Sequence, residues 1–263
     1  MLILGIESAT PVASAALADE EGLLGEVLLN VGLTHSEQLL PMIDDLLHQC
    51  KRTVRDVTAI GVSAGPGSFT GLRIGMATAK ALAQGLSAVS AAAAGEKVPL
   101  LAVPTLEAMA WRLLGQEVVV SPMLNARRSQ IYTGLYRWRH HHAEVFAARQ
   151  RGKKDRMPAG ACGDGWRLDC LIPPEAVSPE DWAKRLDETE YDMYLLGDGA
   201  AMYEEIWRKV PRGRAAILPP VAGLCRGGYI ALAAGRRIRE AGARTMQDAQ
   251  EFYGMKPVYL RGI

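Results

Sequence analysis

The sequence has no cysteine pairing pattern and no excess of charge of either sign. Its four cysteines form no Cys-x-x-Cys pair and lack the spacing of metal ligands, so neither a zinc site nor a redox motif is expected. The formal net charge is +1 over 263 residues, whereas nucleic-acid-binding proteins usually carry a strong basic excess. Any role on RNA is therefore expected to be shared with a partner.

The sequence also lacks a membrane-spanning run and a secretory leader. No apolar stretch approaches the length of a transmembrane helix, and the opening Met1-Leu2-Ile3-Leu4 has no basic segment before the acidic Glu7. A cytoplasmic location without membrane contact is the expectation. With 49% hydrophobic and 22% charged residues, the chain has the composition of an ordinary globular protein, long enough for a large core or two lobes.

A glycine-rich loop between a predicted strand and a predicted helix is the most distinctive stretch. Residues 57–63 are apolar and β-rich, residues 65–67 must turn, and residues from 70 to 86 have a helical pattern. Such a loop directs backbone N–H groups and the positive end of a helix toward whatever lies above it.

Three known loop motifs fail in this stretch. A Walker A loop needs Gly-Lys-Ser/Thr, but Leu72 follows Gly71. A dinucleotide-binding fingerprint needs glycine or alanine where Thr70 stands. A hydrolase elbow around Ser68 needs glycine two residues away on each side and finds Pro66 and Thr70. The sequence of this loop therefore matches none of these phosphate-binding or catalytic motifs.

Small residues recur at every fourth position of the predicted helix after the loop. Gly71, Gly75, Ala79 and Ala83 share one face, and glycine inside a helix costs about 1 kcal/mol relative to alanine. Such a stripe permits close approach of another backbone. The approaching backbone belongs either to the same domain or to a partner. On the partner hypothesis, Gly75→Leu abolishes pairing and leaves the monomer folded.

Four stretches of this sequence together resemble one protein family. They are Gly-Pro-Gly-Ser-Phe-Thr-Gly-Leu-Arg-Ile-Gly at 65–75, Leu-Gly-Ile-Glu-Ser-Ala-Thr at 4–10, Thr-His-Ser-Glu-Gln-Leu-Leu-Pro at 34–41, and Ala-Arg-Arg at 126–128. Through these stretches the chain resembles the TsaB (YeaZ) family, whose members are the accessory component of bacterial tRNA threonylcarbamoyladenosine synthesis. The likeness is strong to about residue 136 and weaker beyond, although the ending Pro-x-Tyr-Leu-Arg also matches.

The predicted elements suit the fold that the resemblance implies, an α/β protein with two ribonuclease H-like lobes of the actin-like ATPase (ASKHA) superfamily. Strands at 2–6, 12–17 and 23–31 predict an antiparallel meander, followed by a helix, the strand at 57–63 and its helix. Strands at 118–124, 131–138, 193–196 and 215–218 and helices at 202–210 and 229–241 restart the pattern. The expected lobes are residues 1–116 and a smaller, degenerate lobe at 117–263.

The resemblance implies a non-catalytic partner protein. The helices at 34–50 and 70–86 would pack against the matching pair of a TsaD-type transferase as a four-helix bundle, or form a homodimer when TsaD is absent. TsaE would supply ATPase action, tRNA would be bound only through the complex, and ATP or ADP only at its interface. The implied partner-interface residues are Thr34, His35, Leu39, Leu40, Ile43, Leu47, Gly71, Leu72, Gly75, Met76, Ala79 and Leu82.

Five positions could be remnants of a nucleotide site. Glu7 ends the first strand where actin-like ATPases carry an acidic residue, Thr10 follows it, Gly65 and Gly67 form the loop, and Asp198 lies between two glycines. For Glu7 the alternatives are a structural remnant or a functional acid. For Asp198 they are a turn former or a phosphate-side residue.

A metal centre and a catalytic set are not expected in this chain. TsaD holds its metal through a His-x-x-x-His pair, whose spacing places both rings on one helix face, but His35 is followed by Leu39 and His48 by Arg52. The run His140-His141-His142 suits a solvated loop, with RNA or metal contact as the alternative. The rival hypothesis is an actin-like ATPase or M22-type glycopeptidase-like hydrolase that uses Glu7, the glycine loop and Asp198.

Overall fold

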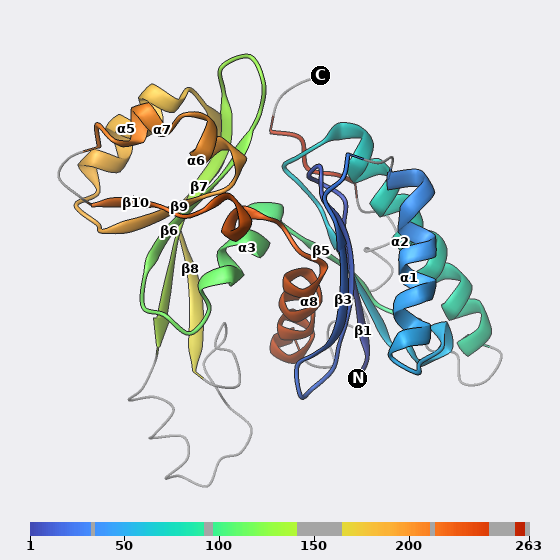
Figure 1. Cartoon of the computed structure of the whole chain (residues 1–263). Coiled ribbons are helices and arrows are strands. Elements are labelled where there is room, and N and C mark those ends of the chain that lie inside the picture. The colour runs from blue at the N-terminus through green and yellow to red at the C-terminus, as the bar shows by residue number, and fades with distance from the viewer. Residues whose placement is uncertain (33–34, 92–96, 141–164, 211–213, 242–255, 261–263) are drawn as a thin grey trace, which may run out of the picture. The chain divides into compact units, whose positions relative to one another are not determined.

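The structure, a computed structural model of the chain, describes residues 1–32, 35–91, 97–140, 165–210, 214–241 and 256–260 (Figure 1). The chain forms two compact units. The first unit consists of Met1–Met109 and Cys225–Ile263, and the second of Ala110–Leu224. Each unit is built on a five-stranded sheet.

The first sheet has the strand order β3-β2-β1-β4-β5. Its strands are β1 (Ile3–Glu7), β2 (Ala13–Ala18), β3 (Leu23–Leu29), β4 (Ala59–Ser63) and β5 (Leu100–Val103). The first three are antiparallel neighbours, whereas β4 is parallel to β1 and β5 is parallel to β4. The central strands β1 and β4 are buried along their whole length, as expected of strands covered on both faces.

Helices cover both faces of this sheet (Figure 1). One face carries α1 (His35–Gln49) and α2 (Phe69–Ala91), and the other carries α8 (Gly227–Ala241). Shorter helices are η1 (Val54–Asp56) and α3 (Thr105–Ala110). Leu39, Ile43, Leu47 and Met76 from the helix pair pack with sheet residues such as Ile60 in one apolar core.

Helix α8 lies close to the first sheet because small residues face one another. Gly5 and Gly61 pair across β1 and β4. A Cβ atom at Gly5 would lie 2.2 Å from the carbonyl oxygen of Gly227, and one at Gly61 would lie 2.8 Å from Cβ of Ala234. The expected lobe of residues 117–263 therefore needs correction: the chain from Cys225 onward belongs to the first unit.

The second sheet repeats the order of the first as β8-β7-β6-β9-β10. Its strands are β6 (Val119–Asn125), β7 (Ile131–His140), β8 (Trp166–Val177), β9 (Met193–Leu196) and β10 (Ala215–Ile217). Again the first three are antiparallel and the last two are parallel additions. The two sheets confirm the predicted α/β architecture of two ribonuclease H-like units.

The helices of the second unit are shorter than their counterparts in the first. They are α5 (Pro179–Glu188), α6 (Asp198–Met202) and α7 (Glu204–Trp207), with the 3-10 turns η2 (Trp111–Leu113) and η4 (Pro220–Gly223). Trp182 and Trp207 are buried in the core of this unit. Trp138 donates its indole N–H to the carbonyl oxygen of Ala110 at 2.8 Å. In the described part of the chain, no helix has the length and apolar character required to cross a membrane.

Candidate functional site

Glu7 is fully buried at the end of β1, where its carboxylate is bonded to the surrounding chain. Oε1 accepts the backbone N–H groups of Ala9 at 2.8 Å and Thr10 at 3.1 Å. Oε2 accepts the thiol of Cys225 at 3.2 Å. Ser63, whose hydroxyl oxygen accepts the N–H of Ser8, also hydrogen-bonds to this carboxyl.

Burial sets the electrostatics of this pair. Burial raises the pKa of Glu7, while the hydrogen bonds from Cys225, Ser63, Ala9 and Thr10 lower it in part. Burial also raises the pKa of the Cys225 thiol well above 9.0, and the nearby Glu7 charge adds to this rise. A thiol in this state is a weak nucleophile. With internal donors on both oxygens, Glu7 acts as the organiser of the β1 turn, which favours its structural reading.

The glycine loop and the start of α2 pack against the turn that Glu7 holds. Ser68 donates its backbone N–H to the carbonyl oxygen of Ala9 at 2.7 Å. A Cβ atom on Gly67 would lie 2.2 Å from that same oxygen. A Cβ atom on Gly71 would lie 2.0 Å from the carbonyl oxygen of Ser8, and one on Gly75 would lie 2.1 Å from the Ser8 hydroxyl.

The stripe at 71, 75, 79 and 83 therefore faces the interior of its own unit. The predicted interface residues that form this interior are Leu39, Ile43, Leu47, Gly71, Leu72, Gly75, Met76 and Ala79. Assigning them to a partner surface was wrong, because the helix pair uses them to cover its own sheet. The expected effect of Gly75→Leu is corrected in the same way, since a larger side chain there would disturb the fold itself.

The remaining predicted interface residues differ in exposure. Leu40 is 53% exposed, and Leu82 is half-buried. His35 is half-buried, and its Nε2 donates to the carbonyl oxygen of Thr10 at 2.8 Å. Thr34 lies outside the described residues. Leu40 is thus the predicted interface residue that is most available on this helix pair.

A second stripe of small residues lies on the outward side of α2. Ala77, Ala81 and Gly85 follow one another at four-residue spacing, and all three are exposed. No atom lies within 4 Å of a Cβ atom built on Gly85. We call these three residues the outward stripe. The outward stripe was not predicted, although its four-residue spacing is present in the sequence.

The glycine loop contacts a segment from the far end of the chain. Val258 donates its backbone N–H to the carbonyl oxygen of Ala64 at 2.7 Å. Tyr259 packs on Phe69 with ring centroids 5.1 Å apart. Gly65, predicted as a nucleotide-side position, is buried with φ +104°. A Cβ atom there would lie 2.4 Å from the carbonyl oxygen of Val258.

Asp198 occupies the corresponding turn of the second unit. It is exposed as the first residue of α6, and its Oδ1 accepts the backbone N–H of Asn125 at 2.9 Å. Asn125 ends β6 as Glu7 ends β1, and its Oδ1 accepts the N–H of Arg127 at 2.8 Å. The structure thus gives Asp198 a role in joining the ends of two adjacent strands, β6 and β9.

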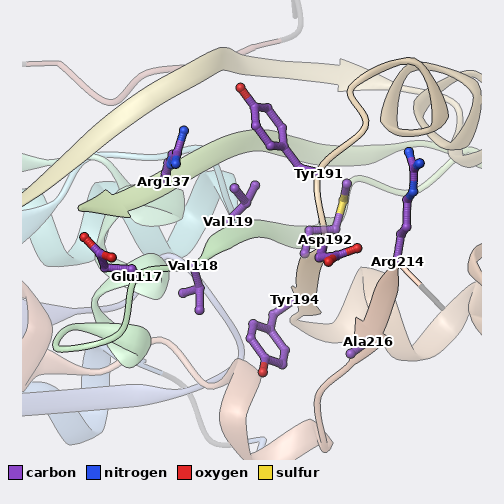
Figure 2. Close-up of a pocket in the computed structure, with 10 residues that line it drawn as sticks. Glu117, Val118, Val119, Arg137, Tyr191, Asp192, Tyr194, Arg214 and Ala216 are labelled. Atoms are coloured by element: carbon purple, nitrogen blue, oxygen red, sulfur yellow. The ribbon is translucent and has the colours of Figure 1, made fainter. Parts of the chain in front are cut away.

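A pocket of about 460 Å³ lies at the opposite ends of these strands (Figure 2). Its polar lining consists of Arg137, Arg214, Glu117, Asp192, Tyr191 and Tyr194. The Arg137 guanidinium lies 5.7 Å from the centre of the Tyr191 ring. Glu117 is engaged elsewhere, because it accepts the backbone N–H of His140 at 3.0 Å.

The pocket carries balanced charges and so favours no ligand of one sign. The lining contains two arginines and two carboxylates, and their formal charges cancel. None of these residues was predicted as a site residue, because they come from separate elements and form no local motif. Among the described residues, no group of three or more His, Cys, Asp or Glu side chains is arranged to hold a metal ion. His141 and His142 lie outside that part of the chain.

Comparison with known proteins identifies the family. A family model described as "TsaD: tRNA N6-adenosine threonylcarbamoyltransferase" matches residues 30–261. The tRNA threonylcarbamoyladenosine biosynthesis protein TsaB of Bacillus subtilis (strain 168) is 26% identical over 99% of this chain and 94% of its own length. The chain belongs to the TsaB (YeaZ) family.

Other members of the TsaB family agree with this assignment. TsaB of Escherichia coli (strain K12) is 34% identical over 139 residues, which is 52% of this chain and 55% of that protein. YeaZ from Pseudomonas aeruginosa superposes with a TM-score of 0.67 at 25% identity, covering 98% of this chain and 99% of its own. The resemblance first drawn from short motifs is thereby confirmed along nearly the whole chain.

Proposed function

We propose that this TsaB-family chain is a non-catalytic subunit for tRNA threonylcarbamoyladenosine synthesis, and that it pairs with a TsaD-type transferase. Membership of a family named for this biosynthesis supports the pathway. The catalytic step would lie with the partner, because this sequence has no His-x-x-x-His pair in α1 and the carboxylate of Glu7 already binds internal donors.

The closed turn at Glu7 carries this proposal. In an ATPase that uses a strand-end acid, the carboxylate must remain available to a metal ion or to water. Here both oxygens of Glu7 accept hydrogen bonds from the protein, and Gly67 and Gly71 bring the loop and α2 directly onto the neighbouring Ser8 and Ala9. The glycine motif thus serves close packing, which favours a structural protein over the ATPase or hydrolase alternative.

The partner surface would be the outward side of α1 and α2. Leu40 is 53% exposed there, and the outward stripe offers a partner helix close approach along α2. Exposed apolar side chains beside small residues suit a helix-on-helix contact. The same face could pair two copies of this chain when no transferase is present.

The remaining roles follow from this pairing. A TsaE-type ATPase would join the complex, and tRNAs that read codons beginning with A would be modified at the adenosine 3′ of the anticodon. Any ATP or ADP would bind at the joint surface, and tRNA would be held by the complex. Because the substrate is tRNA, we infer a cytoplasmic place of action.

A substitution on the outward stripe tests the partner surface. Ala81→Arg places a long charged side chain where close helix approach is needed, so we expect at least a ten-fold loss of affinity for the co-expressed TsaD-type protein. Ala201→Arg, at an exposed alanine of α6 in the second unit, is the matched control and should leave affinity unchanged. Size-exclusion chromatography and calorimetry measure both, and equal affinities in the two variants would contradict the proposed surface.

Nucleotide titration separates the proposal from its rival. An actin-like ATPase should bind MgATP without help, whereas we expect no binding by the isolated chain in calorimetry. Threonylcarbamoyl transfer to tRNA should likewise require the TsaD-type protein. Transfer activity of the purified chain alone would overturn the non-catalytic assignment.

A further inference from the structure

The start of α2 and the glycine loop together form a small docking surface. Ala64 offers its carbonyl oxygen, Gly65 leaves open the space of a side chain, and Phe69 and Arg73 project from the first turns of the helix. The Arg73 guanidinium lies 3.7 Å from the centre of the Phe69 ring, which is a close cation–π contact. This surface thus combines a backbone acceptor, a gap and an aromatic platform.

We propose that this surface is a binding site for an extended peptide segment, occupied in this chain by its own residues 256–260. Val258 provides the N–H donor to Ala64, and its carbonyl oxygen enters the space left by Gly65. Tyr259 lies against Phe69, and its hydroxyl oxygen accepts from Nε of Arg73 at 3.4 Å. We call residues 256–260 the tail segment.

The chemistry of this surface favours a peptide over a phosphate. A phosphate would need free N–H groups, but the N–H of Ser68 is bonded to Ala9 and the N–H of Gly71 to the hydroxyl of Ser68. The acceptor that the loop does present, the carbonyl of Ala64, would repel an anion and attract an N–H donor.

Two parts of the tail segment give the site its selectivity. The backbone N–H of Val258 fixes an extended chain against the loop, while the Val258 side chain is 50% exposed and contributes little. The following aromatic residue stacks on Phe69, a contact worth about 0.5–1.5 kcal/mol in general. The site should therefore accept a donor residue followed by tyrosine and should tolerate changes in the donor's side chain.

A pair of glycine substitutions tests occupancy in the full-length chain. Gly65→Ala adds a Cβ atom 2.4 Å from the carbonyl oxygen of Val258 and should release the tail segment. We expect amide hydrogen exchange at Val258 and Tyr259 to accelerate at least ten-fold. Gly115→Ala is the matched control, because Gly115 has a similar φ of +93° and no atom within 4 Å of its Cβ position. Unchanged exchange in Gly65→Ala would overturn the proposal.

Truncation converts the internal contact into a measurable affinity. A chain that ends at residue 255 should bind a labelled peptide of residues 254–263 in fluorescence anisotropy, and the full-length chain should bind it at least ten-fold more weakly. In the peptide, Val258→Pro should abolish binding by removing the N–H, whereas Val258→Ala should retain it. Tyr259→Ala should weaken binding by up to about ten-fold. Equal binding to both chains, or none to the truncated chain, would overturn the proposal.

These measurements use the chain by itself and are independent of the proposed transferase pairing. A chain that releases its tail segment in Gly65→Ala supports the peptide site even if no TsaD-type protein binds. Conversely, if the Val258 amide is protected from exchange but the chain does not bind a TsaD-type protein, that result counts against the partner surface alone.

Discussion

The two sheets share a strand order but differ in what surrounds the end of their first strand. In the first unit, β1 ends at the buried Glu7, and α2 lies directly on the following turn through Gly71 and Gly75. In the second unit, β6 ends at Asn125, and the short helix α6 begins at the exposed Asp198. One topology thus carries a closed strand end in one unit and a solvent-facing one in the other.

The contrast shows what the glycines of the long motif are for. A helix can lie on a strand-end turn only if no side chain intervenes, and in the first unit the contacts at Gly67, Gly71 and Gly75 are all below 2.5 Å for an added Cβ. The nearest atoms to a Cβ atom on Gly199 of α6 are 3.1 Å away. The glycine requirement is therefore strict where α2 meets the end of β1 and weaker at Gly199 of α6.

Breaking the closed strand end should have the largest effect. Gly71→Ala forces a Cβ atom to within 2.0 Å of a backbone oxygen, so we expect a loss of more than about 3 kcal/mol in unfolding free energy. Gly199→Ala should cost about 1 kcal/mol, and Gly85→Ala, with no neighbour within 4 Å, should gain about 0.5–1 kcal/mol. Urea unfolding measures all three, and similar losses at Gly71 and Gly199 would refute the contrast.

The tryptophans allow the two units to be observed separately. All five tryptophans lie between residues 110 and 224, in the second unit, whereas the long helices α1, α2 and α8 belong to the first. Far-UV circular dichroism should therefore report mainly on the first unit and tryptophan fluorescence on the second. Gly71→Ala should shift the dichroism transition more than the fluorescence transition.

Exchanging the strand-end side chains should have the next largest effect. Glu7→Gln turns an amide NH2 group toward one of the donors that now bind the carboxylate, so we expect a loss of about 2–3 kcal/mol. Asn125→Asp keeps the acceptor for the N–H of Arg127 and should cost less than about 1 kcal/mol. Chemical unfolding of both variants checks this order, and a reversed order would show that Glu7 is not the organising group.

The pH dependence of the first unit should show a smaller effect. The pKa of Cys225 is raised by burial, so the thiol keeps its proton in the folded chain, while the unfolded chain releases it near pH 9.0. Stability contributed by this group is complete below pH 9.0 and falls as the pH rises further. The fall is at most about 1.4 kcal/mol per pH unit for one proton.

Alanine substitutions separate the contribution of the Cys225 thiol to the pH dependence of stability from all other contributions. Cys225→Ala should flatten the decline of unfolding free energy between pH 9 and 10.5, measured by circular dichroism in urea. Cys170→Ala, at an exposed cysteine of the second unit, is the matched control and should keep the slope of the parent chain. If the unfolding free energy of Cys225→Ala declined with pH as steeply as that of the parent chain, the buried thiol would be excluded as the source of the decline.

Local pattern predicted most elements of the first unit. The strand expected at 57–63 contains β4, and the helix expected at 70–86 lies within α2. Local pattern could not decide which face of α2 points inward, because stripes at 71, 75, 79 and at 77, 81, 85 have the same spacing. Only the position of Ser8 and Ala9 under the helix distinguishes them, and that contact joins residues about 63 positions apart.

The second unit was harder to predict for reasons visible in its edge strand. The strand β8 contains Pro173 and Pro174, which remove ladder donors and argue against a strand. The structure accommodates them at an irregularity, where Thr133 pairs with Glu175 and Leu135 with Ile172. The pocket lined by Arg137 and Arg214 was missed as well, because the register of β7 against its neighbours brings its residues together.

The return of α8 to the first sheet has a consequence for synthesis of the chain. Residues 227–241 form α8, which covers the sheet face that contains Gly5 and Gly61. The ribosome must therefore translate most of the 263 codons before this helix can cover that face. Meanwhile the segment from Ala110 to Leu224 has already emerged as a contiguous piece. Although domains usually mature in the order of their translation, the unit that starts first must here finish last.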